Sequence, residues 1–179
     1  DFAQQMKGLV EEAYTEAAAY WLELRTALRN EDTLGLNYAH YHRAVESPDF
    51  LRWAISTPSV DLSLRREAVG SLAWTDPDGA AAFLTALLPP EETPRMIDEL
   101  VGTLDNLKSP QAVPALLAVA QKPGLDAKLR ADAVIAIGQT DSPDVPAALA
   151  LLATDPEARV RDAARFAMVV RDPPGAGYA

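Results

Sequence analysis

The feature that most constrains this chain is one apolar pattern that returns at nearly constant intervals. Its clearest copy, LRADAVIAIGQT at 129–140, places apolar residues three and four positions apart, as on one face of a helix. Related copies are LRREAVGSLAWT from 64 and VRDAARFAMVV from 160. A period of this length built from helices predicts an α-solenoid, in which each helix pair buries its apolar faces against its neighbours. The residues that open the copies are Leu64, Met96, Leu129 and Val160, at steps of 32, 33 and 31.

Prolines divide the same region into short helices. A serine or aspartate directly precedes Pro48, Pro77, Pro110 and Pro143, at intervals of 29, 33 and 33 residues. Proline at the first helical position loses no hydrogen bond, and the polar residue before it can cap the free amides. A second set of breaks falls between these prolines, at 57–58, 89–94, 122–124 and 155–156. The two sets together predict pairs of short helices joined by turns.

Three copies share an apolar residue, an arginine directly after it, and an alanine three positions later. The segments VPALLAVA (113–120) and VPAALALLA (145–153) precede two of them. This region, about 47 to 172, resembles HEAT repeats, in particular the short bacterial variety also seen in phycobilisome-lyase-like HEAT proteins. The copy at 96 departs from the pattern, because Arg95 precedes the apolar residue and Leu100 replaces the alanine. The motif residues are Leu64-Arg65 with Ala68, Leu129-Arg130 with Ala133, and Val160-Arg161 with Ala164.

The predicted fold is all-α: a right-handed α-solenoid of about four HEAT-like helix pairs with a long N-terminal capping helix. Between Phe2 and Asn30 the apolar residues step by three or four, which predicts one long helix. A further helix is expected at about 34–46. Because a terminal repeat needs a cover over its core, residues 1–46 are expected to form an N-terminal helical cap on the array at 47–172. Residues 173–179 are expected to form a flexible or extended tail.

Composition excludes several classes of function. The formal net charge is −10, which disfavours nonspecific attraction to nucleic acid or anionic lipid. No apolar run is long enough for a membrane span, so no membrane insertion is expected. The chain has no cysteine, which removes disulfides and thiolate metal sites. Its start at Asp1 without a targeting segment favours an exported or periplasmic protein over a cytoplasmic one.

No set of residues has the spacing of a catalytic site, so neither enzymatic activity nor a cofactor or metal is expected. His40 and His42 are two residues apart and would point to different sides of a helix. His42 shares a face with Tyr38 and Glu46, but a zinc ion or a general base needs a further ligand or orienting group. A polar-aromatic contact between the first helix and the repeats is the simpler interpretation of this cluster.

One helix face remains for recognition, and a non-catalytic scaffold module that binds a protein or peptide is the predicted function. Resemblance to HEAT arrays implies that the second helix of each pair lines a concave side. Arg95 with Glu99, and Lys128 with Asp132, are same-face pairs on two such helices. Mixed charge on this side fits a protein or peptide partner better than a polyanion, although a merely solvated face explains it equally well. The expected contact residues are Arg95, Glu99, Lys128 and Asp132, followed by Arg66 and Asp98.

Two other functions remain open. A tetrapyrrole-lyase-like protein that binds a small molecule would need a pocket near the first pair, lined by Tyr38, His42 and Trp53. A self-associating structural domain is the other alternative. Trp74 could be an exposed anchor for a partner or could pack under the turn at 76–77, and packing is the favoured interpretation. Resemblance to HEAT repeats also implies that Arg65, Arg130 and Arg161 bridge neighbouring repeats to acids in the turns.

Overall fold

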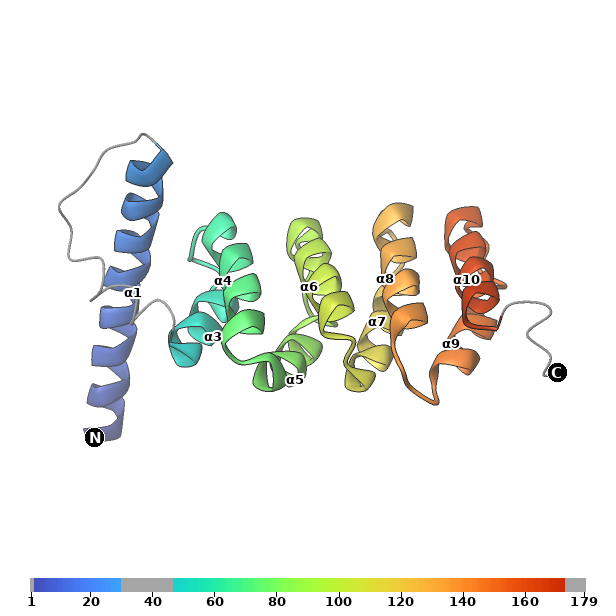
Figure 1. Ribbon diagram of the computed structural model, residues 1–179. Coiled ribbons are helices and arrows are strands. Elements are labelled where there is room, and N and C mark those ends of the chain that lie inside the picture. Colours follow the sequence, from blue (N-terminus) through green and yellow to red (C-terminus); the bar gives the residue numbers. More distant parts are fainter. Residues whose placement is uncertain (1, 30–46, 173–179) are drawn as a thin grey trace. The chain divides into compact units, whose positions relative to one another are not determined.

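The computed structural model describes residues 2–29 and 47–172, and all of the secondary structure in these ranges is helical (Figure 1). The prediction of an all-α fold made of helix pairs is therefore confirmed. The predicted helix at 34–46 and the predicted tail at 173–179 lie outside the described residues. The chain divides into two compact units, residues 1–76 and residues 77–179.

Unit 1 contains a long helix and one helix pair. Helix α1 (Phe2–Arg29) contacts α3 (Pro48–Ser56), and α3 packs against α4 (Leu62–Thr75). Aromatic rings join α1 to α3: the ring centroid of Tyr14 lies 5.5 Å from those of both Phe50 and Trp53. Trp21 lies 6.1 Å from Phe50 and is buried. Aromatic pairs at these separations stabilise a contact beyond the area they bury.

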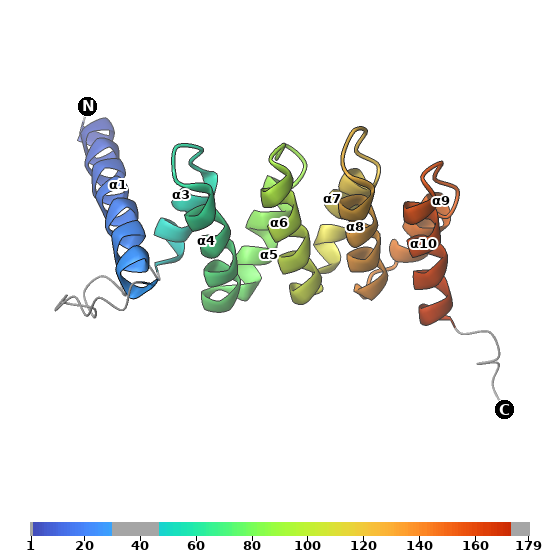
Figure 2. The ribbon, with the colours of Figure 1, turned by 90° about the horizontal axis from the view of Figure 1, so that it is seen from above.

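Unit 2 contains three helix pairs in two rows. Figures 1 and 2 show the second helices side by side in one row and the first helices in another. We call the side of unit 2 formed by the second helices the second-helix face. The first helices are α5 (Pro77–Leu87), α7 (Val113–Ala120), which follows the short 3₁₀ helix η1 (Pro110–Ala112), and α9 (Val145–Leu152). The second helices are α6 (Pro94–Leu107), α8 (Ala127–Gln139) and α10 (Ala158–Arg171).

The residues that define the sequence period form the core of the pairs. They recur on one side of each second helix, so each helix turns the same apolar side inward. Leu129 is half-buried, whereas the other residues of the pattern are almost completely buried. Burial of each large side chain contributes about 1.5–3 kcal/mol to folding. These buried residues are Leu64, Met96 and Val160; Ala68, Leu100, Ala133 and Ala164; and Leu72, Leu104 and Ile137.

The prolines start helices less uniformly than the sequence suggests. Helices α3 and α5 begin at Pro48 and Pro77, but Pro110 opens the 3₁₀ helix and α9 begins two residues after Pro143. The predicted caps before the prolines are wrong for Ser47 and Ser109, whose side chains make no capping hydrogen bond. Side-chain caps occur instead on second helices, where Asp61, Asp126 and Glu157 accept hydrogen bonds from backbone N–H groups two residues later. Among the described helices, none combines the length and apolarity that crossing a bilayer requires.

Candidate functional site

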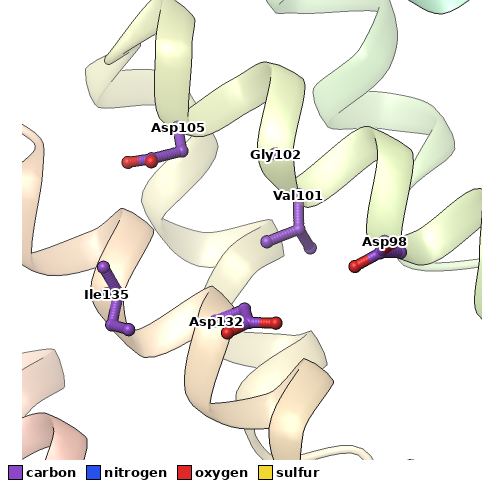
Figure 3. A pocket seen from close by; sticks show the side chains of 6 residues that line it. All are labelled: Asp98, Val101, Gly102, Asp105, Asp132 and Ile135. Carbon is purple, nitrogen blue, oxygen red and sulfur yellow. The ribbon is translucent and has the colours of Figure 1, made fainter.

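An open pocket of about 230 Å³ lies between α6 and α8 on the second-helix face (Figure 3). Helix α6 supplies four of its lining residues, which are spaced by three, four and seven positions and therefore share one side of the helix. Helix α8 supplies two residues three positions apart. The pocket thus follows from the helical period of two neighbouring repeats. Its lining residues are Asp98, Val101, Gly102 and Asp105 from α6, and Asp132 and Ile135 from α8.

Gly102 and Ile135 occupy the same position in successive repeats, six residues after Met96 and Leu129 respectively. A Cβ atom on Gly102 would meet nothing within 4 Å, so this part of the wall is open. The side chain of Ile135 is 42% exposed and provides an apolar edge. The pocket therefore combines open space beside α6, at Gly102, with an apolar contact surface on α8, at Ile135.

Three carboxylates give the pocket a negative charge. Lys128 lies one turn before Asp132 on α8, and its Nζ contacts Asp132 Oδ2 at 2.6 Å. The hydrogen bond and the charge of Asp132, with a further contribution from Asp98, raise the pKa of Lys128 above its ordinary value of 10.5. Asp105 Oδ1 is buried and, among the described residues, has no hydrogen-bond partner. One ammonium group thus partly offsets the three carboxylates at the rim.

The structure brings together part of the predicted contact set. Asp98 and Asp132 line the pocket, and Lys128 is paired with Asp132 at its edge. Arg95 is exposed and Glu99 is half-buried on α6, outside the lining. Arg66 is half-buried on α4 in unit 1, and its predicted role remains a prediction.

Sequence reasoning missed Asp105, Ile135, Val101 and Gly102 as pocket residues. Asp105 is seven residues after Asp98, so the same-face rule that paired Lys128 with Asp132 could have found it. Ile135 carried a weaker signal, because it is an isoleucine at a repeat position where α6 has glycine. Its role depends on which side of α8 faces α6, and only the packed structure shows this.

The repeated arginines form hydrogen bonds within their own helix pairs. Arg65 Nε donates to the backbone oxygen of Ile55 at 2.9 Å, and Arg130 Nε donates to that of Ala120 at 2.6 Å. Each acceptor lies ten residues before its arginine, at the end of the first helix of the same pair. Arg130 also reaches the next pair, because its guanidinium contacts Asp155 Oδ2 at 2.6 Å. Arg161 donates to the Asp155 backbone oxygen at 2.8 Å, within its own pair.

Of the three residues of the second predicted pocket, the structure describes only one. Tyr38 and His42 lie outside the described residues, and Trp53 belongs to the aromatic contact of α1 with α3. Residues 2–29 and 47–172 contain no group of three or more histidines, aspartates or glutamates that could hold a metal ion. The favoured interpretation of Trp74 is wrong: its side chain is 87% exposed near the end of α4 and does not pack under the following turn.

Comparisons with known proteins support the repeat architecture. Residues 90–169 match the family model for HEAT repeats. The structure is similar to that of human deoxyhypusine hydroxylase in complex with glycerol, with a TM-score of 0.61 and 21% sequence identity. The match covers 76% of this chain and 50% of that one, so this chain spans about half the length of the hydroxylase. A comparison with curated protein sequences finds no match. Residues 90–169 are thus similar to HEAT repeats, and the fold is a HEAT-like α-solenoid.

Proposed function

We propose that the chain is a non-catalytic binding module that holds a protein or peptide partner on the second-helix face of unit 2. The observation that carries this proposal is the pocket between α6 and α8, which is open to solvent and lined by both charged and apolar side chains. Interfaces commonly place an apolar or aromatic anchor beside polar groups that fix its orientation. Ile135 provides the apolar contact, and Asp98, Asp105 and Asp132 provide the polar one.

The charge of the pocket selects the chemistry of the partner. Lys128 neutralises one carboxylate of three, so an additional cation is favoured there. The side chain of a lysine or arginine, flanked in the partner by an apolar residue for Ile135, fits this arrangement. The existing contact between Lys128 and Asp132 is an internal example of the ammonium–carboxylate pairing that the partner would make.

The shape of the pocket at Gly102 supports the same proposal. Because this residue has no side chain and open space above it, a partner can approach the backbone of α6. Enzymatic chemistry is not required by this arrangement, and the proposal includes none. HEAT arrays of this kind offer a row of helix faces on which an extended segment can lie.

The test uses a library of random peptides displayed on phage, selected on the full chain and counter-selected on an Asp98→Asn/Asp105→Asn variant. The enriched peptides are expected to share a lysine or arginine next to an apolar residue. Their affinity, measured by fluorescence polarisation, should fall about fivefold for each single asparagine variant, because one charged contact is worth up to about 1 kcal/mol at a solvated site.

The matched control is Asp78→Asn, which removes an exposed carboxylate from α5, on the other row of unit 2. It should leave peptide affinity unchanged. Enriched peptides without basic residues, or equal affinities for the wild-type chain and the Asp98→Asn and Asp105→Asn variants, would contradict the proposal.

A further inference from the structure

Two helices in the described part of the chain present uncovered apolar stripes, and their charges are opposite. On α1, the stretch before Tyr14 exposes Phe2, Met6, Leu9 and Val10. On α10, Phe166, Val169 and Val170 are exposed on one side of the helix, and Met168 is exposed on another. Contiguous apolar residues on a surface mark sites of interaction. The two stripes lie in different units, and each is described below by itself.

The stripe on α1 continues the side of the helix that packs on α3. The aromatic contacts with α3 involve Tyr14 and Trp21, so the preceding three turns extend the apolar side without being buried. Leu9 is 59% exposed, and Glu12 and Glu16 follow it by three and seven residues on the same side. Residues 2–16 contain three glutamates and one lysine, a net charge of −2. This stripe is therefore apolar with an acidic border.

The stripe on α10 lies opposite the side that packs in unit 2. Val160, Ala164 and Ala167 are buried, whereas Phe166 is 68% exposed. Arg165 precedes Val169 by four residues and Arg159 precedes Phe166 by seven, so both border the stripe, and Asp162, four residues before Phe166, lies between them. Two further arginines of the helix, Arg161 and Arg171, donate hydrogen bonds to backbone oxygens of unit 2. The charged residues on the exposed side are therefore Arg159, Arg165 and Asp162, a net charge of +1. This stripe is therefore apolar with a basic border.

Arg165 stands at a repeat position that is apolar in the other second helices of unit 2. It stands five residues after Val160, and the equivalent residues in α6 and α8 are Val101 and Val134, both buried. At this position α6 and α8 present an apolar residue to their surroundings, whereas α10 presents a cation. An acidic helix with an apolar stripe complements that side of α10 better than a further apolar repeat does.

We propose that α1 of one copy docks on α10 of a second copy, so that the chain self-associates head to tail. Leu9 and its neighbours cover Phe166 and Val169, and Glu12 and Glu16 face Arg165. Helix α1 is the proposed partner of α10 because it offers both an apolar stripe and acidic residues beside it. Such a contact is heterologous, so every open assembly keeps one free α1 at one end and one free α10 at the other and can grow. The proposal is independent of the pocket between α6 and α8.

The test is a complementation experiment on the full chain, followed by sedimentation velocity over a range of concentrations. Leu9→Glu removes the α1 stripe and Phe166→Glu removes the α10 stripe. Each variant alone is expected to remain a monomer, whereas the wild-type mass increases with concentration. An equimolar mixture of the two variants retains a single functional contact, α1 of one variant on α10 of the other, so it should form dimers and nothing larger.

Charge reversal provides a second readout at exposed positions that should not affect folding. Arg165→Glu and Glu16→Arg should each weaken association about tenfold, and the double variant should restore most of it. Trp74→Ala, which removes an exposed side chain from α4, is the control and should associate as the wild type does. Circular dichroism and thermal unfolding establish that each variant is folded.

Three results would overturn the proposal. The wild-type chain could stay monomeric at every concentration. Association could survive either single glutamate variant, which would indicate that two α1 helices or two α10 helices meet each other. The mixture of folded variants could fail to form dimers, which would show that the two stripes do not bind each other.

Discussion

Two junctions in unit 2 are built from the same repeat but differ in how closely their helices approach. Helix α6 has Asp105 nine residues after Met96, and helix α8 has Gly138 nine residues after Leu129. Beside Asp105 there is a pocket between α6 and α8. At Gly138 the next helix closes in, because a Cβ atom there would lie 2.7 Å from Ala167 Cβ. The same repeat position therefore lies beside an open junction in α6 and within a closed junction in α8.

The two junctions also differ in their polar connections. Helix α8 carries Arg130 directly after its first core residue, and Arg130 contacts Asp155 in the next pair with both side chains mostly buried. Helix α6 has Ile97 at that position. There, Lys122 Nζ reaches back 31 residues to the backbone oxygen of Glu91 at 2.6 Å. The closed junction thus has an ion pair in addition to hydrogen bonds from Arg171 to the backbone oxygens of Gly138 and Thr140. The open junction has hydrogen bonds from Lys122 to the backbone oxygen of Glu91 and from Lys108 Nζ to Gln139 Oε1.

The largest expected effect is the loss of Arg130. The variant Arg130→Ala removes the hydrogen bond to Ala120 and leaves Asp155, whose side chain is 10% exposed, without its cation. Breaking such a pair should lower the free energy of unfolding by about 2–3 kcal/mol, measured by urea titration. Lys122→Ala, the equivalent test at the open junction, should cost less than about 1 kcal/mol. Equal losses for the two variants would show that the junctions are connected with equal strength.

A smaller effect of opposite sign at the two junctions is expected from glycine replacement. Gly138→Ala forces a methyl group against Ala167 and should destabilise the chain by about 1–2 kcal/mol. Gly102→Ala adds a methyl group that meets nothing within 4 Å, and should stabilise α6 by about 0.5–1 kcal/mol through helix propensity. Thermal unfolding midpoints measure both. If both variants shift the midpoint in the same direction, the distinction between open and closed junctions fails.

The smallest expected effect concerns the rim of the pocket. Asp132 raises the pKa of Lys128, so Asp132→Asn should lower that pKa toward 10.5. An NMR titration of the lysine side chain would measure this change. Since the folded-state pKa is raised, the stabilisation from this pair is fully present below the unfolded pKa near 10.5. It is lost as the pH rises through the higher folded value. No change in the titration on removing Asp132 would mean that the ion pair does not persist in solution.

The sequence predicts the fold better than the site because the two depend on different kinds of information. Leu64, Met96 and Val160 repeat an apolar requirement that every pair must meet, so their spacing reveals the architecture. Asp98 and Asp132 could be placed on one side of their helices by period alone. The pocket itself could not be predicted, because it depends on how far α6 and α8 approach each other. Trp74 shows the same limit: its large apolar ring suggests burial, and only packing reveals that it is exposed.

The hydrogen bond from Arg65 to Ile55 and the bond from Arg130 to Ala120 have an evolutionary consequence. Both partners of each bond belong to a single stretch of about a dozen codons, so the bond is inherited whole whenever that stretch is copied or deleted. Arrays of this type can therefore gain or lose complete helix pairs, and each added pair keeps the hydrogen bond between its two helices. The contact between Arg130 and Asp155 is not inherited in this way, because Asp155 belongs to the next helix pair. This contact is kept only if both pairs are retained next to each other.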